Sequence, residues 1–553
     1  MPAASVDQIL EALDPEQREV VTAVRGPVCV IAGAGTGKTR VITHRIAYAI
    51  AIGVTDSSKT LALTFTARAA GEMRARLRGL GIPNASARTF HSAAIKQLMY
   101  FWPYAFGGSF PSLLTMKSGA IAEALNRTDS SLTPQTSTLR EIASEIEWAK
   151  VLEISPDEYV ESALGAGRTL RIPNNKPDKA NFEDISKVYQ AYETLKQQER
   201  AIDFEDVLLL TVGMLEEDRD VRERVRDQYR YFTVDEYQDV SPLQQRLLNL
   251  WLGNRDDICV VGDAAQTIYS FAGASSSFLL GFTKRFPTAQ VIRLSRGYRS
   301  TPEIIGTANA ILRQGGMIGE HGHELASMNE HGAKPEIAKF DSSAGEANYI
   351  AKKISELRTK AGEHVEVAIL TRTNSQLDIF ERELRSAGIE SQIKSSEKFF
   401  ERVDVRDTMR VIRSASVLPT EGGNWYDDLI AVLRPFGDTD YVHAFLALAK
   451  SMQEDAMTAG NAITLRTYLR ELEDRAEQNN PPSLPGVVLS TLHAAKGLEW
   501  DHVFLAGVSD GILPMGNDIE EERRLFYVGL TRAKSELHLS YSGAPSPFLS
   551  GIL

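Results

Sequence analysis

Lys38 and Thr39 close a glycine-rich loop whose residue types suit the binding of phosphate groups. The loop occupies residues 32–37, after an apolar run at 27–31 and before a segment of helical periodicity that starts at Arg40. Glycines let backbone N–H groups converge on phosphate oxygens, a lysine adds positive charge, and a threonine hydroxyl can bind magnesium. The order of strand, loop and helix predicts a nucleoside triphosphate site; the alternative is a tight turn in another kind of α/β protein.

Two adjacent acids, Asp235 and Glu236, follow a second strand-like run at residues 231–234. A magnesium–nucleotide site needs a carboxylate at the end of such a strand. Asp235 would hold the metal through water, and Glu236 would orient and deprotonate the attacking water. Solvated turn residues are the alternative, but the glycine loop favours the catalytic interpretation.

A third stretch, GDAAQTIYSFAGA at residues 262–274, follows an apolar run at 257–261. It places a polar amide, Gln266, and two aromatic rings, Tyr269 and Phe271, just past the end of a predicted strand. Either ring could pack in a core beneath a cleft or contact a ligand there.

The composition sets wider bounds on the protein. Its 553 residues, 43% apolar and 24% charged, correspond to an ordinary globular protein of about three to four compact units. A net charge of −12 argues against nonspecific nucleic-acid binding but is compatible with a local basic channel. Cys29 and Cys259 lie in apolar runs and are expected to be buried thiols. Because the chain shows neither a signal pattern nor a membrane-length apolar run, we expect a cytoplasmic protein.

The elements that position these residues follow from the pattern of the chain. Alternating strand-like and helix-like segments predict an α/β fold with parallel sheets. About two hundred residues separate the glycine loop from Asp235, more than a crossover connection needs, so a helical insertion must lie between them. Amphipathic segments at 139–152 and 185–198 fit it. A second sheet is expected to begin near Val291, to continue through 365–374 and to close with 486–507.

Two further segments carry local predictions. The basic, proline-interrupted stretch 167–180 is interpreted as a linker rather than a phosphate-contacting loop. Near the C-terminus, Asn517 and Glu520 form a capping-box pattern, which predicts the start of a helix that leads to Arg532.

Twelve segments occur in the order found in the UvrD/Rep/PcrA family of superfamily 1 DNA helicases, which the chain resembles from about Leu13 to about Tyr541. They are LDPEQREVV (13–21), the glycine loop, LALTFTARAAGEM (61–73), TFHS (89–92), IDFEDVLLL (202–210), VDEYQDVSPLQ (234–244), GDAAQTIYSFAGA (262–274), LSRGYRS (294–300), VAILTRTNSQ (367–376), FFERVDVRD (399–407), STLHAAKGLEWDHVFL (490–505) and EERRLFYVGLTRAK (521–534).

The resemblance implies an α/β fold with two RecA-like, parallel-sheet P-loop NTPase domains that carry helical insertions. Motor domain 1A would comprise residues 1–92 and 200–288, with helical insertion 1B at 93–199. Motor domain 2A would comprise residues 289–414 and 486–553. Residues 415–485 would form a 2B-like accessory domain that is shorter than is usual in the family.

The resemblance also implies ATP and Mg²⁺ as ligands and assigns residues to them. Catalytic roles are implied for Lys38, Asp235, Glu236, Gln266, Arg299 and Arg532. Nucleotide contacts are implied for Gln17 (adenine), for Ala32, Gly33, Ala34, Gly35, Thr36, Gly37, Lys38, Thr39 and Arg40 (phosphates), for Tyr298 (base stacking), for Arg299 (γ-phosphate) and for Glu499 (ribose). Thr39 and Asp235 would serve the metal. Contacts to single-stranded DNA are implied for Phe65, Thr66, Arg68, His91, Tyr269, Phe271 and His493.

By the same resemblance, Gln266 senses the γ-phosphate while the two rings hold DNA, so one loop would couple hydrolysis to movement. ATP would draw Arg299 and Arg532 toward Lys38, and hydrolysis would release them. The family usually has tryptophan where Phe271 stands and arginines where Ser270 and Ala272 stand, so we expect a weaker grip on DNA.

The implied function is that of an ATP-hydrolysing DNA helicase or translocase that moves 3′ to 5′ on single-stranded DNA and serves repair or replication. The alternative is a nucleotide-switched DNA- or partner-binding ATPase that translocates but unwinds poorly without a partner. Expected partners are single-stranded and tailed duplex DNA and a repair or replication protein. No membrane is expected, and the chain would be a monomer or self-associate weakly.

Overall fold

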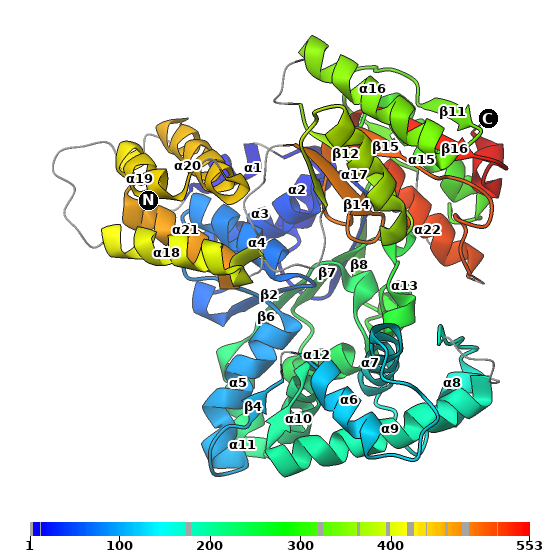
Figure 1. The fold of residues 1–553 in the computed structure, drawn as a ribbon. Coiled ribbons are helices and arrows are strands. Elements are labelled where there is room, and N and C mark those ends of the chain that lie inside the picture. The colour runs from blue at the N-terminus through cyan, green and yellow to red at the C-terminus, as the bar shows by residue number, and fades with distance from the viewer. Residues whose placement is uncertain are drawn as a thin grey trace. The chain divides into compact units, whose positions relative to one another are not determined.

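The computed structural model describes residues 4–11, 13–114, 116–172, 178–318, 324–361, 365–393, 399–416, 425–437, 439–458, 463–477, 486–516 and 518–552. Its contacts divide the chain into two compact units (Figure 1). Unit 1 comprises Met1–Ile31, Thr39–Phe65 and Arg76–Arg293, and unit 2 comprises Ala32–Lys38, Thr66–Ala75 and Leu294–Leu553. Within the described ranges, no helix is both long enough and apolar enough to cross a bilayer.

Unit 1 is built on a six-stranded sheet of order β3-β2-β6-β7-β1-β8. Its strands are β1 (Val28–Ala32), β2 (Thr60–Thr64), β3 (Ser86–Thr89), β6 (Tyr231–Val234), β7 (Ile258–Gly262) and β8 (Gln290–Leu294). The pairings among β1, β2, β3, β6 and β7 are parallel. Both β2 and β7 are buried along their whole length, as expected for parallel strands covered on both faces.

The prediction that a second sheet begins near Val291 is wrong. That residue lies in β8, which is the edge strand next to β1 in the first sheet. Three of its five residues are exposed, and the Gln290 N–H donates to the Pro27 carbonyl over 3.0 Å. Local hydrophobic pattern identifies a strand but does not say which sheet completes its hydrogen bonds.

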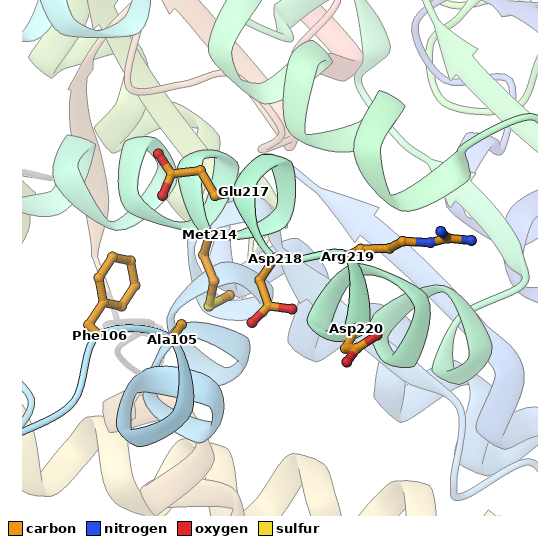
Figure 2. A pocket seen from close by; sticks show the side chains of 7 residues that line it. All are labelled: Ala105, Phe106, Met214, Glu217, Asp218, Arg219 and Asp220. Atoms are coloured by element: carbon orange, nitrogen blue, oxygen red, sulfur yellow. The ribbon is translucent and has the colours of Figure 1, made fainter.

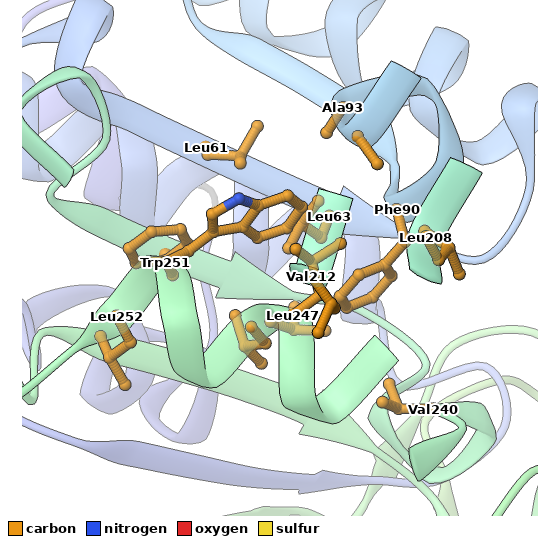
Figure 3. Close-up of a cluster of buried hydrophobic side chains, with 14 of the residues drawn as sticks. Leu61, Leu63, Phe90, Ala93, Leu208, Val212, Val240, Leu247, Trp251 and Leu252 are labelled. Carbon is orange, nitrogen blue, oxygen red and sulfur yellow. The ribbon is translucent and has the colours of Figure 1, made fainter. Parts of the chain in front are cut away.

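Helices pack against this sheet to form the main core of unit 1. They include α3 (Lys38–Ala51), α5 (Phe90–Ala105), α10 (Phe204–Glu217), α11 (Arg219–Gln228) and α12 (Pro242–Leu252). Figure 3 shows Leu61 and Leu63 of β2 among Phe90 of α5 and Trp251 of α12, all of them buried. The Trp251 indole N–H donates to Gln97 Oε1 over 2.8 Å, so the polar atom of this large ring is paired inside the core.

A helical insertion stands between α5 and α10 in unit 1. Its helices are α6 (Ser118–Asn126), α7 (Thr136–Val151), α8 (Tyr159–Gly165) and α9 (Asp178–Glu199). They enclose a core of their own that includes Ile146, Tyr159 and Phe182. The buried ammonium group of Lys150 pairs with Asp203 over 2.8 Å where the insertion meets α10. The expected helical insertion is therefore present, although its assignment as a separate domain stays a prediction.

Unit 2 contains a second six-stranded sheet, of order β11-β16-β15-β12-β14-β13. Its strands are β11 (Glu336–Phe340), β12 (Val367–Thr371), β13 (Ser391–Ile393), β14 (Val487–Thr491), β15 (Trp500–Leu505) and β16 (Ala533–Ser542), and neighbouring strands pair in parallel. Helices α15 (Pro302–Gln314), α16 (Ser343–Ala361), α17 (Leu377–Ser386) and α22 (Ile519–Leu530) accompany it. In Figure 1, α16 lies along β11 and β16.

Four more helices of unit 2 share a separate apolar core. They are α18 (Val403–Ala415), α19 (Trp425–Leu433), α20 (Asp440–Thr458) and α21 (Leu465–Glu477). Leu429, Phe445 and Tyr468 are fully buried in this core, which reaches back to Phe399. The helical cluster thus begins before residue 415, where the sequence placed the start of the accessory segment. The proline-rich end of that segment, at 479–485, lies outside the described residues.

The start of α22 differs by one residue from the prediction. Its N-cap is Asp518, whose carboxylate accepts the Glu521 N–H over 2.9 Å. Asn517, the predicted cap, lies outside the described residues. Asparagine and aspartate are comparable caps, so adjacent cap residues leave the helix start ambiguous by one position.

Candidate nucleotide and single-stranded DNA site

The glycine loop leaves β1 at Ala32 and turns tightly before α3 begins at Lys38. Gly35 has a φ of 75°, a left-handed conformation that favours glycine. The Thr36 hydroxyl donates to the Gly33 carbonyl over 3.0 Å, and the Lys38 ammonium donates to the Ala32 carbonyl over 3.1 Å. The loop therefore holds its lysine close to its own backbone, next to the predicted phosphate position.

Two glycines of the loop are required by close neighbours within unit 2. A Cβ atom on Gly35 would lie 2.8 Å from the Cβ of Arg299, and one on Gly33 would lie 2.5 Å from the Leu325 side chain. The Tyr298 N–H also donates to the Gly35 carbonyl over 2.9 Å. The structure thus brings the loop together with Tyr298 and Arg299, the residues predicted to contact the base and the γ-phosphate.

Arg299 and Glu499, predicted to contact phosphate and ribose, pair with each other. The Arg299 Nε lies 2.6 Å from the Glu499 carboxylate, and its Nη1 donates to the Thr531 carbonyl over 3.1 Å. Burial opposes ionisation of Glu499, but the positive charges of Arg299, Lys534 and Arg532 together lower the pKa of Glu499 below its usual value. Glu499 is therefore charged at neutral pH.

Arg532, predicted to be a second phosphate-contacting arginine, is almost fully buried. Its Nε donates to the Val528 carbonyl over 2.8 Å and its Nη1 to the Leu498 carbonyl over 3.1 Å. These bonds join α22 to the segment before β15. Arg532 therefore has a structural role that the sequence did not indicate, and its phosphate contact stays a prediction.

The two adjacent acids stand at the carboxyl end of β6 in unit 1. Asp235 is buried and accepts the Glu236 N–H over 3.0 Å. Glu236 has a φ of 52°, one of three positive values among the described non-glycine residues. Such conformations cost free energy and cluster at functional sites, where they re-aim a side chain. The carboxylate at Asp235 and the hydroxyl at Thr39 are oxygen donors of the type that Mg²⁺ prefers.

A chain of hydrogen bonds links Glu236 to Gln266. The Gln238 amide donates to the Glu236 carboxylate, and Gln238 Oε1 accepts the Asp263 N–H over 3.0 Å. The Asp263 carboxylate in turn accepts the Gln266 amide over 2.8 Å. A Cβ atom on Gly262 would lie 2.6 Å from Gln238 Oε1, so this glycine makes room for the chain. Gln238 and Asp263 have no distinct sequence signal of their own, although each lies within one of the family motifs, at 234–244 and 262–274.

Three predicted DNA-binding rings lie together beyond Gln266. Phe65 and Tyr269 are stacked, with ring centroids 5.4 Å apart and planes 17° from parallel. Phe271 meets Tyr269 edge-on at 6.2 Å. Phe65 is 42% and Phe271 50% exposed, so both offer ring surface to a ligand. Core packing was the alternative for Phe271 and Tyr269: the half-exposed Phe271 does not fit it, while Tyr269 is partly buried between the other two rings.

Replacing Phe65 with alanine should weaken single-stranded DNA binding by about 1–3 kcal/mol, or about 5- to 150-fold in Kd, because an exposed stacking surface is lost. Fluorescence anisotropy with a labelled oligothymidine measures the change. The matched control is Tyr104→Ala, which removes a ring that is 73% exposed on α5 and not part of this group. Equal affinity of the Phe65 variant and the wild type would contradict the assignment.

Arg168 connects the helical insertion to the aromatic loop. Its guanidinium donates to the Glu145 carboxylate over 2.9 Å, lies 4.3 Å above the Trp148 ring and donates to the Phe271 carbonyl over 3.1 Å. A Cβ atom on Gly273 would come within 2.6 Å of the insertion's α7. Arg168, in the predicted linker 167–180, is therefore packed against the insertion, and the loop that bears Phe271 contacts the insertion.

His91 lines a pocket of about 690 Å³ between the start of α5 and the insertion helices. Phe204, Lys117 and Arg140 also line it. The His91 ring packs at 5.5 Å from that of Phe204, and its Nε2 is buried without a hydrogen-bond partner among the described residues. Burial lowers the pKa of His91 to about 4, so the ring is neutral at pH 7 and would bind DNA as a hydrogen-bonding group, not as a cation.

This pKa predicts the direction of a pH effect on stability. Burial lowers the pKa of His91 from 6.5 to about 4, so the unfolded chain takes up the proton first as the pH falls. The stabilising contribution of the neutral ring is present above about pH 6.5 and is lost as the pH falls toward about 4. We expect His91→Gln to reduce the drop in thermal midpoint between pH 7 and pH 5. An equal drop in both proteins would contradict this.

The other predicted site residues lie outside the groups described above. The Gln17 side chain is buried and forms a capping box with Asp14 at the start of α2 (Pro15–Thr22), a structural role beside the predicted adenine contact. Burial lowers the pKa of Arg68, and the carboxylates of Glu72 and Glu499 oppose this change by raising the pKa. Burial lowers the pKa of His493 to about 4. Thr66 and Arg40 are exposed.

A smaller pocket, of about 340 Å³, lies away from these residues in unit 1 (Figure 2). Its lining residues come from the end of α5 and from the junction of α10 and α11: Ala105, Phe106, Met214, Glu217, Asp218, Arg219 and Asp220. Three carboxylates and one guanidinium do not suit a polyphosphate, and none of the predicted site residues is among them.

Comparison with known proteins gives matches over both units. The UvrD/REP helicase N-terminal domain matches residues 13–287, and the UvrD-like helicase C-terminal domain matches residues 292–416 and 438–544. The chain is 43% identical to the ATP-dependent DNA helicase UvrD2 of Mycobacterium tuberculosis H37Rv, over 99% of this chain and 82% of that protein. It is 28% identical to the ATP-dependent DNA helicase PcrA of Bacillus subtilis strain 168, over 97% of this chain and 83% of that protein.

Proposed function

Because the chain belongs to the UvrD/REP helicase family, we propose that it is an ATP-dependent DNA helicase that translocates along single-stranded DNA and unwinds duplex. The observation that carries the proposal is the hydrogen-bond chain from Glu236 to Gln266, which runs into the loop that bears Tyr269 and Phe271. Groups suited to hydrolysis and groups suited to holding unpaired bases thus share one continuous segment of unit 1.

In this proposal Glu236 accepts the proton of the attacking water, and Gln238 holds its carboxylate in place. Lys38 and Arg299 bind the phosphates, with Glu499 and Tyr298 toward the ribose and the base. Mg²⁺, held at Thr39 and Asp235, would offset phosphate charge when bound. Gln266 responds to the γ-phosphate; Asp263 and Gln238 link it by hydrogen bonds to Glu236, and the loop that follows Gln266 bears Tyr269 and Phe271.

The grip on DNA would come from ring stacking by Phe65 and Phe271, with a further contact from His91 in the pocket that it lines. Stacking tolerates any base sequence, which suits a motor that must pass along arbitrary DNA. The direction of travel, 3′ to 5′, is taken from the family. We also propose the family's domain plan for this chain, with two bounds moved to fit the first sheet and the helical cluster: motor domains at 1–92 with 200–293 and at 294–402 with 486–553, an insertion at 93–199 and a short accessory segment at 403–485. A cytoplasmic role in repair or replication completes the proposal.

The test is strand displacement on a duplex with a 3′ single-stranded tail, measured over a range of protein concentrations, together with ATP hydrolysis with and without oligothymidine. We expect ATP-dependent displacement of the 3′-tailed duplex, little on a 5′-tailed one, and hydrolysis stimulated by DNA. Stimulated hydrolysis without displacement would favour a translocase that needs a partner to unwind. Hydrolysis indifferent to DNA would contradict both.

A further inference from the structure

Two histidines and a glutamate meet on one face of the second sheet, far in sequence from the predicted phosphate loop. His502 stands on β15, and Glu536 and His538 stand on the neighbouring β16. His502 is the direct partner of Glu536 in the ladder, and the register between the strands shifts just before this pair. One ligand atom from each of the three residues lies within 4.8 Å of the other two. Register shifts of this kind re-aim side chains and occur next to functional sites.

The distances within this group match a metal site better than a hydrogen-bonded one. His502 Nδ1 and His538 Nε2 each lie 3.4 Å from the same Glu536 oxygen. Both nitrogens are buried, and neither has a hydrogen-bond partner among the described residues. Ligand bonds of about 2.0–2.1 Å in a tetrahedral zinc site place neighbouring ligand atoms about 3.3 Å apart. Each unpaired nitrogen thus lies from the carboxylate oxygen at the separation of two corners of such a tetrahedron, and the two nitrogens lie within 4.8 Å of each other.

An outer layer of residues already orients the His538 ring. Its other nitrogen, Nδ1, lies 3.2 Å from the Glu336 carboxylate of β11. Glu336 is held in turn by the Tyr349 hydroxyl over 2.7 Å and by Lys353 over 3.2 Å, both from α16. The Phe504 ring stacks on His538 at 4.4 Å and 10° from parallel. A carboxylate on the far nitrogen of a histidine is the usual second layer of a metal site, where it sets the tautomer and the aim of the ring.

A comparison within the chain shows what distinguishes this group. Among the described residues, Glu193, Asp203 and Asp206 also lie close enough to share an ion. That group already surrounds the ammonium groups of Lys150 and Lys196, which lie 2.8 Å and 3.1 Å from Asp203. Its charge is therefore balanced by the protein itself. In the part of the chain that the structure describes, no ammonium or guanidinium group contacts the facing atoms of His502, Glu536 and His538.

We propose that His502, Glu536 and His538 bind one Zn²⁺ ion, with water in the fourth position. Two imidazoles and one carboxylate are ligands that zinc accepts readily, and imidazole favours zinc over Mg²⁺ or Ca²⁺. The Glu536 side chain is 36% exposed, which leaves the site open on one side for the ion and its water. The ion ties β15 to β16, the strands that flank the segment bearing Arg532, and stabilises unit 2 independently of ATP and DNA.

The test uses the full chain freed of metal with EDTA and dialysed, then titrated with ZnCl₂ by isothermal titration calorimetry. We expect one equivalent to bind and the thermal midpoint to rise. His502→Gln and His538→Gln should each weaken binding by at least about 100-fold, and Glu336→Gln by about 10- to 100-fold with unchanged stoichiometry. The matched control is His331→Gln, since His331 is an exposed histidine of unit 2 that pairs with Glu303.

Co²⁺ provides a readout on the unaltered protein in case a variant fails to fold. We expect the strong visible absorption of four-coordinate Co²⁺, which one equivalent of Zn²⁺ abolishes. Absence of saturable Zn²⁺ binding by the wild type would overturn the proposal. Binding that persists unchanged in both histidine variants, or a Co²⁺ spectrum of six-coordinate type, would overturn it equally.

Discussion

Glu236→Gln should lower DNA-stimulated ATP hydrolysis by about 10²- to 10⁴-fold, the usual contribution of a general base. The amide keeps the shape of the side chain but cannot take a proton from water. Nucleotide binding should persist, because the phosphates are assigned to Lys38 and the glycine loop. Steady-state hydrolysis with saturating oligothymidine, together with equilibrium binding of a fluorescent ATP analogue, separates the two effects.

The control for this substitution is Glu223→Gln on α11, which removes an exposed carboxylate that pairs with Arg226. It should hydrolyse ATP at the wild-type rate. A Glu236 variant that retains more than about a tenth of wild-type hydrolysis would not be missing its general base, and the assignment would have to move to another residue.

Gln238→Glu should reduce stimulated hydrolysis by about 10- to 100-fold, the scale of losing a residue that orients a reacting group. Gln238 is fully buried; its amide nitrogen donates to Glu236 and its oxygen accepts from the Asp263 N–H. Glutamate keeps the acceptor for Asp263 but turns a second carboxylate oxygen toward Glu236. The two like charges repel, so Glu236 loses its orientation and its pKa rises.

The expected rise in the pKa of Glu236 can be detected as a change in the pH–rate profile. The variant's remaining activity should increase with pH over a range where the wild type is already constant, because a higher pH is needed to ionise Glu236. The pH–rate profile therefore distinguishes a positioning role from a general loss of structure. Gln290→Glu, at the exposed start of β8, is the matched control and should leave the profile unchanged. A Gln238 variant with the wild-type rate and pH–rate profile would contradict the proposed role of the hydrogen bonds from Glu236 to Gln266.

Much of the architecture could be predicted from local pattern. The apolar runs predicted at 27–31, 231–234 and 257–261 are strands to within one residue at either end, and the residues assigned to hydrolysis follow their carboxyl ends. Both cysteines are buried thiols, as expected. The parallel sheets of both units and the family matches confirm the fold class. These predictions are confirmed because hydrophobic periodicity and the placement of glycine depend on only a few neighbouring residues.

The errors and omissions concern partners that are distant in sequence. No local signal shows that β8 joins the first sheet, that Arg168 reaches Phe271, or that Arg532 donates to Leu498. The role of Gln238 could not be predicted because its partner Asp263 follows a different strand, β7, and the sequence does not show that β6 and β7 are neighbours. The group of His502, Glu536 and His538 likewise forms only when β15 and β16 pair.

The central claim is that the bond chain from Glu236 to Gln266 couples hydrolysis to the rings that hold an unpaired strand. The most direct measurement is the ratio of ATP hydrolysis rates with and without oligothymidine in Gln266→Ala. We predict a ratio close to one, with ATP and DNA each still bound at near wild-type affinity. Stimulation as large as in the wild type would show that DNA binding is coupled to ATP hydrolysis by other residues, and would contradict the coupling through Gln266.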